Sequence, residues 1–209
     1  MDPLTSVLPE LGRASRVKTI ARAGSRPAIG ELCVLVGIGA LAALAETQLQ
    51  FSPRIPGHAI LRAVLPMSLG LALVPRRGSG LIMSVSGVLS LAGLYLLSAG
   101  RVGTGALVSM AALGPLLDLA AGRSVAGWRL YARFALAAAA ANLLAFASRM
   151  LAAQLMFDTG SGRGFLVHWP TSLVSYLACG VVAGLVSGIC WFRLSPRRNA
   201  GASPERGEI

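Results

Sequence analysis

Six long apolar stretches alternate with short polar or basic segments, and this alternation constrains the fold of the chain more than any other feature. A helix of about 18 residues, at 1.5 Å per residue, just crosses the hydrocarbon core of a bilayer, which is about 30 Å thick. Hydrophobic residues make up 55% of the chain and charged residues only 13%, which is too apolar for an ordinary soluble domain. The sequence therefore predicts an all-α integral membrane protein with six transmembrane helices. The predicted spans are Ala28 to Leu49, Pro56 to Pro75, Gly80 to Ala99, Val102 to Ala121, Tyr131 to Phe157 and Trp169 to Arg193.

The placement of basic residues predicts the direction of these helices. With a cytoplasmic N-terminus, fourteen Lys and Arg residues fall on the inner side and three on the outer side. Cytoplasmic loops carry such an excess, so both termini are predicted to lie inside (N-in/C-in). The predicted domains are a basic cytoplasmic N-terminal segment (1–27), the six-helix transmembrane domain (28–193) and a cytoplasmic C-terminal tail (194–209). Topology thus accounts for the net charge of +11. We expect a multi-pass protein of the cell inner (plasma) membrane that contacts membrane lipid and no nucleic acid.

Motifs for catalysis or cofactor binding are not found in the sequence. There is no GxSxG, no HExxH and no glycine-rich phosphate loop followed by Lys-Ser/Thr. Cys33, Cys179 and Cys190 lack CxxC spacing and lie in apolar runs, which is typical of small packing residues. We therefore predict a protein that is not an enzyme and that needs no cofactor.

Polar side chains within the apolar stretches gather toward the predicted outer side. His58 and Arg62 lie four residues apart and project from one helix face, and an arginine inside a membrane segment is costly enough to suggest a function. We predict a pocket open to the outside, lined by the first, second, fifth and sixth spans, that binds a small polar or anionic solute. The candidate substrate-binding residues are Glu46, His58, Arg62, Asn142, Arg149, His168 and Tyr176.

The same residues allow other interpretations. Arg62 and Arg149 could extend to the outer headgroups, or could pair with Glu46 or Asp158 as structural ion pairs. The two histidines, together with one of these acids, offer borderline ligands for a metal ion. Two arginines in the same zone would repel a divalent cation, so no metal site is predicted.

Small residues at four-residue spacing predict close packing of helices. Such spacing occurs in the first span and again, as a GxxxGxxxG series, in the last span. At the predicted inner side, Asp118 is expected to pair with one of the arginines at 123, 129 and 133, or to help dock a cytoplasmic partner. The candidate partner-docking residues are Gly39, Ala43, Gly180, Gly184 and Gly188.

This pattern resembles the membrane-embedded substrate-binding (S) components of energy-coupling-factor transporters, which share a six-helix fold with both termini inside. The resemblance spans about residues 28 to 193 and rests on three passages: GIGALAALA, RIPGHAILRAVLPMSLGLALVPRRGSGLIMS and GALVSMAALGPLLDLAAG. It implies a protein that captures a vitamin-like solute from outside and releases it inside with a second membrane subunit and two cytoplasmic ATPases. In the S components an alanine-xxx-alanine face on helix 1 docks the partner subunit, and Gly39 and Ala43 approximate that face here.

The passage GHAILRAVL is also similar to the related cobalt and nickel uptake membrane subunits, where a glycine-histidine pair opens a comparable helix. Those proteins use an N-terminal Met-His as part of their metal site, whereas this chain begins Met1-Asp2-Pro3. The leading hypothesis is a solute-capture subunit of a multi-component importer. The alternatives are a non-transporting membrane scaffold or assembly protein that packs against partner helices, and a subunit for divalent metal uptake.

Overall fold

The computed structural model describes residues 28–48, 57–97, 104–121, 128–155 and 168–192, and within these ranges all regular structure is helical. The all-α prediction is therefore confirmed for the described residues. The predicted N-terminal segment and C-terminal tail lie outside them. The helices are α2 (Ile29–Gln48), α3 (Ile60–Leu73), α4 (Ser79–Leu97), α5 (Thr104–Ala121), α6 (Trp128–Leu155) and α8 (Trp169–Trp191).

Four of these helices, α2, α4, α6 and α8, are long and apolar enough to cross a membrane. The apolar part of α5 (Gly105–Ala121) and the whole of α3 are shorter. Large aliphatic side chains remain exposed on the outward faces, for example Leu89 of α4 and Leu136 of α6, as a protein surrounded by lipid requires. The membrane-helix character predicted from the sequence is thus supported by four helices, while the count of six spans and their orientation stay predictions.

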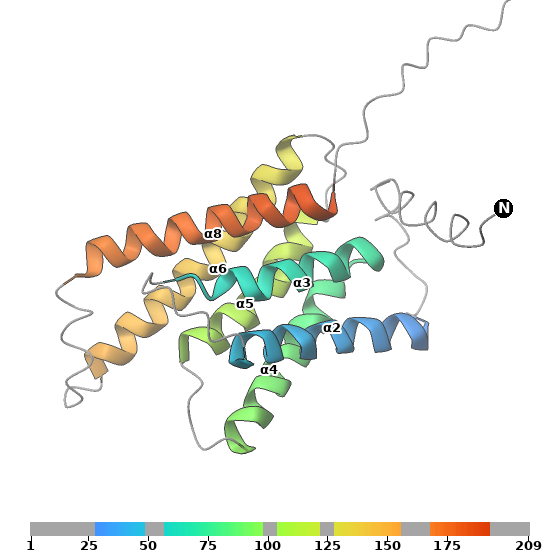
Figure 1. Cartoon of the computed structure of the whole chain (residues 1–209), viewed down its shortest axis with the longest axis horizontal. Helices are drawn as coiled ribbons and strands as arrows, with labels where there is room; N and C mark the ends of the chain where they lie inside the picture. The colour runs from blue at the N-terminus through green and yellow to red at the C-terminus, as the bar shows by residue number, and fades with distance from the viewer. Residues whose placement is uncertain (1–27, 49–56, 98–103, 122–127, 156–167, 193–209) are drawn as a thin grey trace, which may run out of the picture.

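The short helix α3 contacts all five of the other described helices. Ile60, Val64, Met67 and Leu71 recur every three or four residues along it and are all buried. The other contacts form a series from α8 through α6, α5 and α4 to α2, and α3 contacts both helices at the ends of this series. In Figure 1, α8, α3 and α2 lie side by side, with α3 between the other two.

A turn before α3 makes this helix shorter than the sequence predicts. Gly57 has a φ of +86°, and the turn at residues 57–59 delays the start of the helix to Ile60. The helix therefore has 14 residues and is about 21 Å long, less than the thickness of a hydrocarbon core. Pro66 lies inside α3, and the helix continues beyond it to Leu73.

Glycines allow the long helices to approach one another closely. A Cβ atom at Gly39 of α2 would overlap the carbonyl oxygen of Met83 on α4. A Cβ atom at Gly184 of α8 would likewise overlap the carbonyl oxygen of Phe134 on α6. Since lipid is as apolar as the side chains, such close van der Waals contact is a main source of helix association in a membrane.

Candidate functional site

The turn that precedes α3 lies against α6 and α8, and Gly57 is the point of contact. A Cβ atom at Gly57 would lie 2.8 Å from the Tyr176 Cα atom and 3.1 Å from the Asn142 Nδ2 atom. Both the positive φ and the lack of space require glycine here. Sequence reasoning missed this residue, although its place between Pro56 and His58 is a recognisable turn signal.

Asn142 joins this turn to α8. Its side-chain amide donates two hydrogen bonds from Nδ2, to the Gly57 carbonyl oxygen at 3.1 Å and to the Tyr176 carbonyl oxygen at 2.6 Å. The side chain is buried, with 2% of its surface exposed, so both amide hydrogens need partners within the protein. Asn142 therefore holds three elements together near the middle of α6.

Tyr176 extends the same cluster toward Arg149. The Arg149 guanidinium donates from Nη1 to the Tyr176 hydroxyl oxygen at 2.8 Å. The Tyr176 ring is buried and meets the Phe146 ring edge-on, with centroids 5.5 Å apart. The aliphatic part of Arg149 packs over Gly105 of α5, while the residue as a whole stays exposed. The aliphatic carbons of Arg149 thus contact the protein, while another part of the same side chain stays exposed.

The second polar cluster joins the start of α3 to the end of α2. Arg62 donates from Nη2 to the His58 Nε2 atom at 3.0 Å, since arginine has no acceptor. It also donates from Nη1 to the carbonyl oxygen of Glu46 at 3.4 Å. The half-buried Glu46 side chain feels the positive charge of Arg62, and its Oε2 atom is buried without a hydrogen-bond partner.

Six of the seven predicted substrate-binding residues thus belong to two clusters that meet at adjacent residues, Gly57 and His58. The seventh, His168, is exposed at the start of α8, where its carbonyl oxygen accepts a hydrogen bond from the Ser172 amide. His168 precedes Tyr176 by eight residues, which is about 12 Å along a helix axis. The structure therefore brings together residues of α2, α3, α6 and α8, the four helices that were predicted to line the site.

Metal binding was not predicted at these positions. Within the described ranges, no group of three or more His, Cys, Asp and Glu side chains is placed to hold a metal ion. The acid nearest to His58 and Arg62 in the cluster is Glu46, and its charge partner is the arginine.

The predicted partner-docking residues are occupied by packing within the chain. Gly39 and Ala43 are buried on α2, with Gly39 against α4. On α8, Gly180 and Gly184 are pressed against the α6 backbone, and Gly188 faces the Tyr131 ring. Their small size serves the α2–α4 and α6–α8 contacts, and docking of a separate subunit through them stays a prediction.

Asp118 has a structural role that sequence reasoning missed. Its carboxylate accepts hydrogen bonds from the Gly80 amide at 2.9 Å and the Leu81 amide at 3.0 Å. Those amides belong to the first turn of α4, where the backbone donors have no partner in their own helix. Arg129 and Arg133 are not among its partners in the described part of the chain. Asp118 of α5 therefore caps α4.

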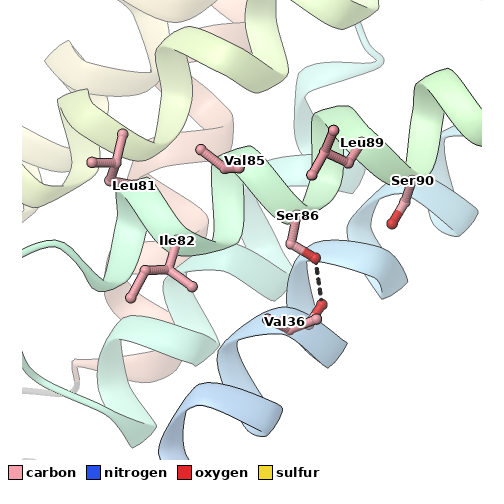
Figure 2. A pocket seen from close by; sticks show the side chains of 7 residues that line it. All are labelled: Val36, Leu81, Ile82, Val85, Ser86, Leu89 and Ser90. Carbon is pink, nitrogen blue, oxygen red and sulfur yellow. Dashed lines mark hydrogen bonds between the residues drawn. The ribbon is translucent and has the colours of Figure 1, made fainter. Parts of the chain in front are cut away.

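A separate apolar groove of about 590 Å³ is lined by Val36 of α2 and by residues of α4 (Figure 2). Its wall contains two serines, Ser86 and Ser90, and Ser86 donates a hydrogen bond to the Val36 carbonyl oxygen at 2.8 Å. None of the predicted substrate-binding residues lines it. The aliphatic residues that line it are Val36, Leu81, Ile82, Val85 and Leu89.

Searches of protein-family models, curated proteins and solved structures return no match for this chain. The resemblance to the S components stays an expectation from the sequence. Function must therefore be inferred from the residues and their geometry.

Proposed function

We propose that this protein is a membrane-embedded solute-capture subunit that binds a small polar or anionic solute. The observation that carries the proposal is the joining of Arg62, His58 and Glu46 to Asn142, Tyr176 and Arg149 through the turn at Gly57. Polar groups from four helices are costly to keep inside a bundle of apolar helices. Their convergence in one zone favours a binding role.

Charge favours an anionic solute. Arg62 and Arg149 supply two guanidinium groups, which bind carboxylate and phosphate oxygens through paired hydrogen bonds. The N-terminal end of α3, with its partial positive charge, points into the same zone. The carboxyl group of Glu46, beside Arg62, adds acceptor oxygens for a donor group on the solute. A solute with both an anionic group and a hydrogen-bond donor fits this set.

The full arrangement that we propose has six spans, both termini in the cytoplasm and the plasma membrane as its location. The short helix α3 counts as a span together with the residues that precede it. The solute then enters from the outer side, and release inside requires a second membrane subunit and cytoplasmic ATPases. Support for this orientation comes from the excess of Lys and Arg on the inner side.

The test begins with native mass spectrometry of the purified protein, to detect a co-purified small anion. Retention is then compared for Arg62→Leu, Arg149→Leu and the control Arg129→Leu, which removes an exposed arginine near the opposite end of α6. We expect each of the first two to lower retention by about tenfold or more, since each removes a charge-assisted hydrogen bond. The control should retain the anion as the wild type does.

A membrane scaffold is the second candidate, and one observation favours it. Arg149 and Asn142 use hydrogen bonds to tie α6 to α8 and to the turn before α3, as a purely structural network would. In that case Arg62→Leu and Arg149→Leu would lower thermal stability in detergent, and no small molecule would be found with the wild type. That pair of results would exclude solute capture.

A further inference from the structure

We propose that the groove between α2 and α4 binds an acyl chain of an anionic phospholipid, with the phosphate at the Arg77 end. This site is separate from the proposed solute site, because none of the polar residues of that site lines the groove. Three features carry the inference: the chemistry of the wall, the length of the groove, and the charge beside it.

The wall suits a hydrocarbon chain and little else. Leu81, Val85 and Leu89 follow one another at four-residue spacing along α4, and all three are more than half exposed (Figure 2). The Ser86 hydroxyl, which could otherwise bind a polar ligand, donates to the carbonyl oxygen of Val36 across the floor. An occupant therefore gains mainly by burying apolar surface.

The length of the groove matches one leaflet. Leu81 and Ser90 are nine positions apart along α4, which corresponds to about 14 Å. Half of the hydrocarbon core of a bilayer is about 15 Å thick. A single acyl chain that follows α4 from headgroup level to the bilayer midplane would therefore fill the groove along its whole length.

In the described part of the chain, basic residues flank the groove at its Leu81 end. Arg77 is exposed in the turn before α4, four residues before Leu81. Two acids lie at this end: Glu31 of α2 forms an ion pair with the neighbouring Arg76 at 3.0 Å, and Asp118 accepts hydrogen bonds from the Gly80 and Leu81 amides. Arg77 therefore adds a positive charge where the headgroup of the bound lipid would lie, which favours an anionic phosphate over a zwitterionic one.

The experiment measures the retention of two lipids by the full-length protein in mild detergent. Phosphatidylglycerol and phosphatidylcholine with identical chains are supplied at equal concentration, and bound lipid is counted by native mass spectrometry. Leu89→Trp should lower retention of both lipids roughly tenfold, because the indole displaces about two methylene groups of the chain. Arg77→Gln should lower the preference for phosphatidylglycerol by about fivefold and leave phosphatidylcholine retention unchanged.

Leu136→Trp on α6 is the matched control, because Leu136 is 69% exposed and Leu89 is 67% exposed. It should leave retention unchanged. Equal retention by wild type, Leu89→Trp and Leu136→Trp would mean that only loosely associated surface lipid is counted, and would overturn the proposal. A wild-type dimer that Leu89→Trp converts to a monomer, with no lipid bound, would assign the groove to a second copy of the chain. The Arg77→Gln result stands even if Leu89→Trp fails to fold.

Discussion

Gly57 shows how one residue without a side chain can position several that have one. Its positive φ turns the chain into α3, and the missing Cβ lets the turn rest on Tyr176 and Asn142. Arg62 and His58 follow within five residues, so their direction depends on this contact. The position of the candidate site is thus set by backbone geometry at a glycine as much as by the charged residues.

Replacing Gly57 by alanine should destabilise the protein more than the same change at Gly78. Both glycines have a positive φ, +86° and +87°, so both changes carry a similar strain of about 1–2 kcal/mol. Only at Gly57 would the new Cβ collide with Tyr176, whereas it would meet nothing within 4 Å at Gly78. The extra cost should be about 1–3 kcal/mol, measured as a free energy of unfolding in detergent. Equal losses for the two variants would mean that the turn does not pack on α8.

Asp118→Asn should destabilise the contact between α5 and the start of α4. The asparagine keeps one acceptor oxygen but turns an amino group toward the second amide, so one of the two hydrogen bonds is lost together with the charge. We expect a loss of about 1–2 kcal/mol in the free energy of unfolding. Ser109→Ala, which removes a hydrogen bond to Ala106 within α5, serves as the control and should cost about 0.5 kcal/mol. Equal costs would contradict the capping role.

At the scale of helices, the sequence predicts positions well and contacts poorly. The span predicted from Trp169 to Arg193 ends within two residues of α8, because the length of an apolar run is a local property. The contact of Asp118 with the start of α4 spans 38 residues, and that of Asn142 with Gly57 spans 85 residues. No local pattern marks such pairs. Nearness in sequence pointed to Arg123, Arg129 and Arg133 as partners for Asp118. Arg129 and Arg133 are not partners in the structure, and Arg123 lies outside the described residues.

For the candidate site, too, the sequence predicted which residues take part but not the contact that joins them. The polar residues of four spans were predicted to meet because positive-inside counting placed them at one depth, and six of the seven belong to the joined clusters. The turn at Gly57 was not predicted, because Pro56 and Pro75 mark the limits of an apolar run but not the residue at which the helix begins. Whether the clusters bind a solute stays a prediction.

Gly37 and Gly39 of α2 provide a matched test of helix packing. A Cβ atom at Gly39 would overlap the Met83 carbonyl oxygen and lie 2.9 Å from the Ser86 Cβ atom, so Gly39→Ala should push α2 and α4 apart at a cost of about 1–3 kcal/mol. At Gly37 there is nothing within 4 Å, and Gly37→Ala should leave stability unchanged or raise it by up to about 1 kcal/mol. Unfolding in detergent measures both. Similar effects of the two changes would contradict the close α2–α4 contact.

At the scale of the whole molecule, the two proposed sites use opposite properties of the membrane. The solute site gathers Arg62, Arg149 and Asn142 from helices that pack around α3. The groove is formed by outward faces of α2 and α4, where apolar surface is left for lipid. Both assignments depend on the direction of the helices, since the solute site must face outward and Arg77 must lie at the inner headgroups.

The orientation can be tested at the two ends of α6. Arg129 and Gln154 are both exposed and lie near opposite ends of this 28-residue helix, which is about 42 Å long and exceeds the hydrocarbon core. In a background with Cys33, Cys179 and Cys190 changed to serine, Gln154→Cys should react with a membrane-impermeant maleimide on intact cells. Arg129→Cys should react only after permeabilisation, because positive-inside counting places it in the cytoplasm.

Because both proposed sites depend on the orientation of α6, the cysteine-labelling experiment tests both of them. Labelling of Arg129→Cys from outside, with Gln154→Cys protected, would place Arg62 and Arg149 toward the cytoplasm and would rule out capture from the outer side. It would also place the Arg77 end of the groove in the outer leaflet, where anionic lipid is not the expected partner. Labelling of both residues from outside would mean that α6 does not cross the membrane at all. Only the predicted pattern is compatible with a polar cluster that faces outward and a basic groove end that faces inward.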